Sequence, residues 1–126
     1  MSALEQARAH LAKAREFLQA AQFNLDLDLF NAATSDAVIS GINSKDAICL
    51  RVTSTTRKAD NHNEAVAELK AAGPVGASLA STLNRLLRLK TKSQYQSASI
   101  ASADASRAVE WATRMLDAAE QVVTAR

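Results

Sequence analysis

The stretch SALEQARAHLAKAREFLQAAQFNL, residues 2–25, has a leucine at every seventh position and an alanine midway between successive leucines. On a helix this spacing places both residue types on one stripe, which Phe17 widens. The pattern predicts a helix of about 24 residues, with Ser2 as its N-cap and Glu5 three positions on. We expect the stripe to pack inside its own chain rather than form a zipper, because alanines and Phe17 suit a bundle. Its members are Leu4, Ala7, Leu11, Ala14, Leu18, Ala21 and Leu25.

The rest of the chain shows further helical periodicity and no strand-like alternation. Asp60 or Asn61 is expected to cap a short helix that ends before Gly73, and Ser102 to cap the last one. Polar stretches at 53–56 and 93–99 are predicted to be loops. The sequence predicts an all-α bundle of about five helices, four long and one short, as a single domain over residues 1–126. The other long helices are expected over 28–52, 76–90 and from 102 onward.

Composition bears on the packing of the helices and on the expected location of the protein. Aromatic residues make up 4% of the chain and alanine dominates its apolar content, which favours closely packed helices. The single cysteine, Cys49, excludes an intramolecular disulfide and suits a reducing compartment, so a cytoplasmic location is predicted. No apolar run approaches the roughly 20 residues of a membrane span, and no signal peptide is expected. The formal charge of +2 is nearly neutral.

Most catalytic classes lack their residues. The only histidines are His10 and His62, and neither has the spacing of a metal site, so no metal and no cofactor are predicted. Cys49 lies in an apolar helical segment, where a buried, unreactive thiol is expected. His10 falls on the leucine stripe and is expected at the edge of the core, making one hydrogen bond.

Arg57 and His62 form the first candidate site. An arginine and a histidine held together can bind a phosphate and move a proton, the chemistry that cleavage of an RNA backbone requires. Histidine has an unperturbed pKa close to neutral, which suits such a role. The alternative is that a polar loop contains both residues by chance and His62 helps to begin a helix.

A run of cations forms the second candidate site, a ligand-binding one. Arg85 and Arg88 share a helix face, and no acidic residue lies between Leu79 and Ile100. Tyr95 follows and would stack a base or ribose. The alternative is a solvated helix face whose last cations suit the helix dipole. The proposed ligand-binding set is Arg85, Arg88, Lys90, Lys92 and Tyr95.

The chain resembles a HEPN domain in three stretches that together span most of its length. These are the opening helix with ARAHLAKAREFL (7–18), the segment DLFNAATSDA (28–37), and LLRLKTKSQY (86–95) followed by SADA (102–105). The resemblance implies an antiparallel helical bundle that commonly forms a homodimer. It also implies a toxin–antitoxin setting with an antitoxin-like protein partner.

Active members of that family are metal-independent ribonucleases, in which four to six residues separate an arginine from the histidine that follows it. Arg57 and His62 match this spacing, but Lys58 replaces the polar residue that usually follows the arginine. Lys90 and Gln94 stand where minimal members have arginine and aspartate. The departures favour a module that binds RNA, a nucleotide or a partner protein over the alternative, a ribonuclease toxin using Arg57 and His62.

Polar residues also interrupt the predicted central helix. Ser40 and Asn43 lie three positions apart, as do Asn43 and Asp46, so that a polar stripe runs along one side. Two interpretations remain open: an exposed face, or a wet dimer seam or ligand cleft. The polar residues are Asp36, Ser40, Asn43, Lys45 and Asp46.

Overall fold

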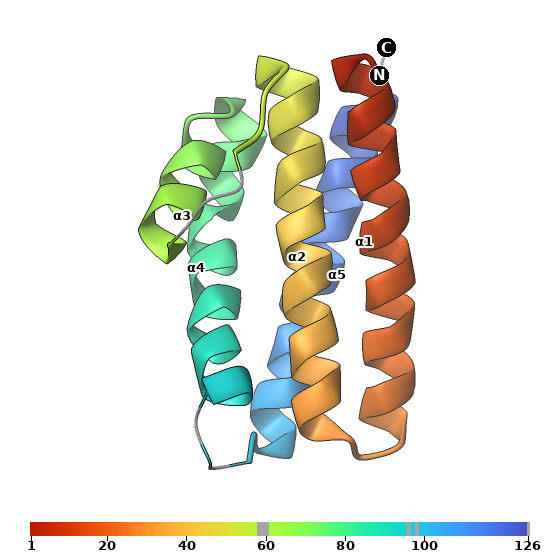
Figure 1. Cartoon of the computed structure of the whole chain (residues 1–126), viewed down its shortest axis with the longest axis vertical. Coiled ribbons are helices and arrows are strands. Elements are labelled where there is room, and N and C mark those ends of the chain that lie inside the picture. Colours follow the sequence, from red (N-terminus) through yellow and green to blue (C-terminus); the bar gives the residue numbers. More distant parts are fainter. Residues whose placement is uncertain (58–60, 96, 98, 126) are drawn as a thin grey trace.

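The computed structural model describes residues 1–57, 61–95, 97 and 99–125, and over these the chain forms five helices and no strand. The four long helices lie side by side with alternating directions, and the short helix α3 lies against the outer side of α4 (Figure 1). The prediction of an all-α bundle with four long helices and one short helix is confirmed. The helices are α1 (Ala3–Asp26), α2 (Phe30–Thr53), α3 (His62–Lys70), α4 (Gly73–Tyr95) and α5 (Ser102–Thr124). None of these helices is long and apolar enough to cross a membrane.

Helix α1 forms as its heptad pattern predicts. The Oγ of Ser2 accepts a hydrogen bond of 3.0 Å from the backbone N of Glu5, which caps the helix. The stripe packs inside the chain, against α2 and α5, with its alanines more completely buried than its leucines. Only the ends of the stripe differ: Leu25 is half-buried and Leu4 is 38% exposed.

The predicted ends of α4 are wrong at both sides. The helix begins at Gly73, not at Gly76, because Gly73 adopts a φ of 76° and Pro74 has no N–H to satisfy in a first turn. It continues to Tyr95, so the serine-containing segment after Lys90 is helical in its first part. Ser102 is the first residue of α5 instead of its cap; Ala101 occupies the cap position without a side-chain hydrogen bond.

Helix α2 is the centre of the bundle and packs against α1, α4 and α5. Gly41 permits this close packing, because a Cβ at that position would lie 2.6 Å from Cδ1 of Leu86 and 3.6 Å from Sδ of Met115. Ser40 is also fully buried, and its Oγ donates a 2.7 Å hydrogen bond to the carbonyl of Ala14. The polar stripe of α2 is therefore not an exposed face, since Ser40 and Lys45 lie inside the chain.

Candidate functional site

The most concentrated polar chemistry surrounds Lys45, which is only 2% exposed. Its Nζ donates to Oε1 of Glu68, to Oδ1 of Asp46 at 3.1 Å and to Oγ1 of Thr56 at 3.2 Å. A further hydrogen bond of 3.3 Å reaches the carbonyl oxygen of Arg57. These contacts join α2, α3 and the segment between them. We call Lys45, Asp46, Thr56 and Glu68 the lysine cluster.

Charges within the lysine cluster stabilise one another. Burial alone would lower the pKa of Lys45, but the hydrogen bond to Glu68 and the charge of Asp46 outweigh it, and the pKa is raised. Burial alone would raise the pKa of Glu68, but the hydrogen bonds from Lys45 and from the backbone of Arg57 outweigh it, and the pKa is lowered. Both groups stay ionised at neutral pH. The arrangement suits a structural role in which the charges of Lys45 and Glu68 hold α2 and α3 together.

Cys49 lies one turn beyond Lys45 and is fully buried. Burial raises the pKa of its thiol to about 12, despite the opposing charge of Lys45. The thiol is therefore protonated at neutral pH and cannot act as a nucleophile. This agrees with the expectation of a buried, unreactive cysteine.

Arg57 lies beside carboxylates instead of facing an open phosphate site. Its backbone N donates to both carboxylate oxygens of Glu68, at 3.1 and 3.2 Å. The exposed side chain lines a cavity of about 440 Å³ together with Glu64 and Glu68. Two acids in the same cavity oppose the binding of a phosphate.

His62 is the first residue of α3 and is half-buried. It does not line the cavity that contains Arg57, and no described hydrogen bond or ion pair joins the two side chains. Asn61 caps α3 as expected, since its side chain accepts from the backbone N of Glu64 at 2.9 Å. Lys58, which follows the arginine, and Asp60, the other expected cap, lie outside the described residues.

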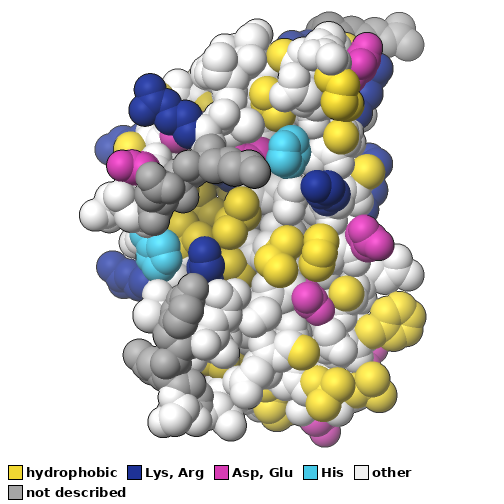
Figure 2. Space-filling model, viewed as in Figure 1, with side chains coloured by type: hydrophobic (Ala, Val, Ile, Leu, Met, Phe, Trp, Pro, Cys, Tyr) yellow, Lys and Arg dark blue, Asp and Glu magenta, His cyan; other side chains and the backbone are white. Residues whose placement is uncertain are grey.

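The other histidine, His10, makes described polar contacts. Nδ1 of His10 lies 2.8 Å from Oδ1 of Asn43, the single hydrogen bond expected for it, and 3.9 Å from Oδ2 of Asp46. Because Asp46 belongs to the lysine cluster, His10 extends that network toward the surface, with 30% of its side chain exposed. Figure 2 shows the histidine side chains as well-separated groups on this face of the molecule.

The predicted ligand-binding cations lie on the second half of α4. Arg85 and Arg88 are exposed, and neither makes a described ion pair. Lys92 continues on the same side, seven positions after Arg85, and its Nζ lies 3.5 Å from Oδ2 of Asp104. Lys90 is half-buried on another side of the helix. The side chain of Tyr95 lies outside the described residues.

Neither a metal site nor a relative identifies the function. Over the described part of the chain, no three His, Cys, Asp or Glu side chains come together as metal ligands would. No protein-family model matches the sequence, and no curated protein matches it significantly. A function must therefore be inferred from the geometry of the described residues.

Sequence reasoning did not find the lysine cluster as a unit. The available signal was a lysine one helical turn before the apolar residues Ile48, Cys49 and Leu50. A buried lysine requires carboxylate partners, but Asp46 alone was visible nearby. Glu68 lies 23 positions further along the chain, on another helix.

Proposed function

We propose that this protein is a HEPN-like binding module that holds RNA on the exposed cations of α4 and does not cleave it. The observation that carries the proposal is the exposure of Arg85 and Arg88 on one face, without a described carboxylate partner. Guanidinium groups in this state are available for bidentate hydrogen bonds to phosphate oxygens. Lys92 lies on the same side and extends the row of cations, although its ammonium group also forms an ion pair with Asp104.

The contrast with Arg57 supports binding over cleavage. An RNA phosphate at Arg57 would meet the carboxylates of Glu64 and Glu68 in the same cavity. An RNA phosphate at Arg85 or Arg88 would meet no described acid on α4, because the helix contains none. Electrostatic attraction thus favours α4 as the place where RNA docks.

The proposal is tested by fluorescence anisotropy with a labelled single-stranded RNA of about 12 nucleotides, within the usual span of one binding module. The double variant R85Q/R88Q removes two exposed guanidinium groups and is expected to weaken binding about tenfold, since charge-assisted contacts to phosphate are lost. The matched control K70Q/R114Q removes two exposed helical cations elsewhere, and we expect its affinity to equal that of the wild type. Equal losses in both variants, or no loss in R85Q/R88Q, would contradict the proposal.

The ribonuclease alternative is distinguished in the same samples. Gel analysis of the RNA after prolonged incubation is expected to show intact strands with the wild-type protein. The alternative function would be assigned to Arg57 and His62 by two results together. The wild-type protein would still cleave the RNA after purification by a second route, and His62→Ala would not cleave it.

A second candidate function is self-association, favoured by an apolar surface at the turn between α1 and α2. Phe23, Leu27 and Leu29 are 62%, 67% and 51% exposed, high values for large apolar side chains. Figure 2 shows hydrophobic side chains gathered at the lower right, where α1 and α2 meet in Figure 1. We propose that a second copy of the chain covers this turn, which agrees with the homodimer that the HEPN resemblance implies. An antitoxin-like partner, the other implied occupant, would then bind elsewhere on the dimer.

A further inference from the structure

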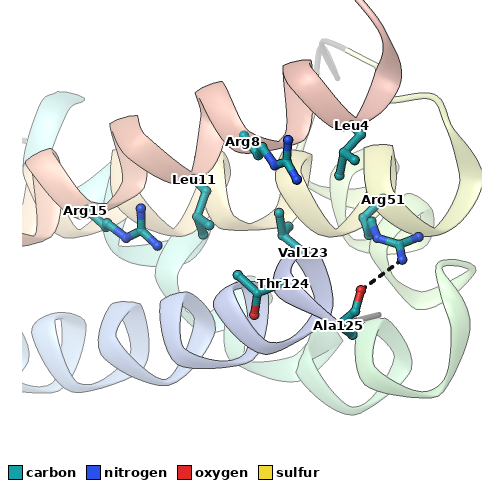
Figure 3. Close-up of a pocket in the computed structure, with 8 residues that line it drawn as sticks. All are labelled: Leu4, Arg8, Leu11, Arg15, Arg51, Val123, Thr124 and Ala125. Carbon is teal, nitrogen blue, oxygen red and sulfur yellow. Dashed lines mark hydrogen bonds between the residues drawn. The ribbon is translucent and has the colours of Figure 1, made fainter.

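We infer that the cavity between α1, α5 and the end of α2 binds a phosphate monoester with a small organic group. The cavity has a volume of about 540 Å³, within the range of pockets that hold small organic ligands. Figure 3 shows arginine and apolar side chains around it. The arginines are Arg8, Arg15 and Arg51, and the apolar residues are Leu4, Leu11, Val123 and Ala125.

Two helices, α1 and α2, contribute the arginines. Arg8 and Arg15 lie seven positions apart on α1, so both project from the side next to the leucine stripe, two turns apart. Arg51 lies in the last turn of α2, where a cation also interacts favourably with the helix dipole. A cavity with guanidinium groups from separate helices offers donors from several directions, as a tetrahedral phosphate requires.

The three arginines differ in the ion pairs and hydrogen bonds that their side chains make. Nε of Arg15 lies 2.7 Å from Oε1 of Glu120, and NH2 of Arg51 donates at 3.2 Å to the carbonyl of Ala125, as Figure 3 shows for the latter. Arg8 makes no described ion pair. Among the described residues, Glu120 is the only carboxylate paired with these arginines, and the remaining positive charge suits a phosphate monoester, which carries about −1.5 to −2 at neutral pH.

The apolar residues indicate that the ligand carries more than a phosphate. Leu11 and Val123 are each only 3% exposed and belong to the core, whereas Leu4 is 38% exposed. Figure 3 shows Leu4 and Leu11 directed from α1 toward the end of α5. An organic group placed against these side chains would bury the apolar surface that Leu4 leaves exposed, and it would gain affinity over the bare ion.

Isothermal titration calorimetry with phenyl phosphate, inorganic phosphate and phenol tests both the phosphate-binding arginines and the apolar part of the site. We expect phenyl phosphate to bind at least tenfold more tightly than inorganic phosphate, and phenol to show no saturable binding. Arg8→Gln is expected to weaken phenyl phosphate at least tenfold, and Arg51→Gln to weaken it as well. The control Arg114→Gln removes an exposed arginine of α5 outside the cavity and should retain the wild-type affinity.

The same titration separates this site from the RNA-binding face. R85Q/R88Q should bind phenyl phosphate as the wild type does, so a failure of either proposal leaves the other standing. Unchanged affinity in Arg8→Gln, equal affinity for phenyl and inorganic phosphate, or loss of phenyl phosphate binding in R85Q/R88Q would each overturn the inference. Thermal unfolding of each variant verifies that it is folded before titration.

Discussion

Nζ of Lys45 donates a hydrogen bond to Oε1 of Glu68, and this contact fastens α3 to the central helix α2. The lysine is almost completely buried, whereas the side chain of Glu68 is 20% exposed. A charge inside the chain is thus balanced by a partner that water can reach. Together with the packing of α3 against α4, the contact explains why a nine-residue helix, marginal in isolation, has a defined position beside the bundle.

Glu68→Gln is expected to destabilise the protein more than Lys45→Met does. The glutamine variant leaves a buried cation with a weaker partner and should cost about 2 kcal/mol. The methionine variant removes the buried charge and fills the space with an apolar chain, which is often close to neutral for buried pairs. Urea unfolding of both variants measures the two free energies. A larger loss for Lys45→Met would contradict this role of Glu68.

Stability is expected to fall at both ends of the pH scale. The pKa of Glu68 is lowered on folding, so its contribution is complete above its usual pKa of 4.5 and is lost as the pH falls through the folded value. The pKa of Cys49 rises from 9.0 to about 12, so its contribution is complete below pH 9.0 and is lost as the pH rises toward 12. Urea midpoints measured across the pH range should show both declines.

Two variants identify the residue responsible for each decline in stability. Glu68→Gln should flatten the acid side, and Cys49→Ala should flatten the alkaline side between pH 9 and 12. Because Glu68 also raises the pKa values of Lys45 and Cys49, Glu68→Gln is expected to reduce the alkaline decline as well. Lys45, whose pKa is raised above 10.5, adds a further loss at the highest pH that Cys49→Ala leaves in place. An alkaline decline between pH 9 and 10 that is unchanged in Cys49→Ala would be incompatible with the buried thiol.

Ser40 and Ser44 provide a matched pair on α2, since both are fully buried. The Oγ of Ser40 donates to the carbonyl of Ala14, whereas the Oγ of Ser44 has no described partner. Ser40→Ala should lose about 1 kcal/mol of unfolding free energy, because a buried hydrogen bond disappears. Ser44→Ala should be neutral or stabilising, because it removes an unpaired hydroxyl. Chemical unfolding that ranks the two in the opposite order would show that Ser44 has a partner.

Self-association through the α1–α2 turn is tested by Leu27→Glu. A charge at a position 67% exposed should leave the fold intact and shift a dimer toward monomer, because it would be buried at the proposed interface. Val75→Glu, at an exposed apolar residue on α4, is the control. Analytical ultracentrifugation measures the result; equal dissociation constants for wild type and Leu27→Glu would place any interface elsewhere.

The fold follows from the sequence wherever periodicity is long and unbroken. The heptads of α1 predict that helix and most of its buried residues. The ends of α4 were missed because Gly73 and Pro74 can begin a helix as well as stop one. The serines from Ser93 onward are typical of a loop, but the helix continues to Tyr95.

The candidate sites follow from the sequence only where their residues are local. The spacing of Arg85 and Arg88 was sufficient to place both on one face. Arg57 and His62 had a suitable spacing, but spacing could not show that Glu68, 11 positions beyond Arg57, would bind its backbone. Side chains from different helices meet through tertiary packing, which periodicity along one helix does not record.

The dependence of RNA affinity on salt tests the central claim most directly, because it counts the phosphate contacts made by α4. For single-stranded RNA the slope of log K against log salt is about −0.7 for each neutralised phosphate. We predict that R85Q/R88Q reduces the magnitude of the slope by about 1.4, with K70Q/R114Q unchanged from the wild type. A slope that is the same in R85Q/R88Q as in the wild type would contradict the binding of RNA by α4.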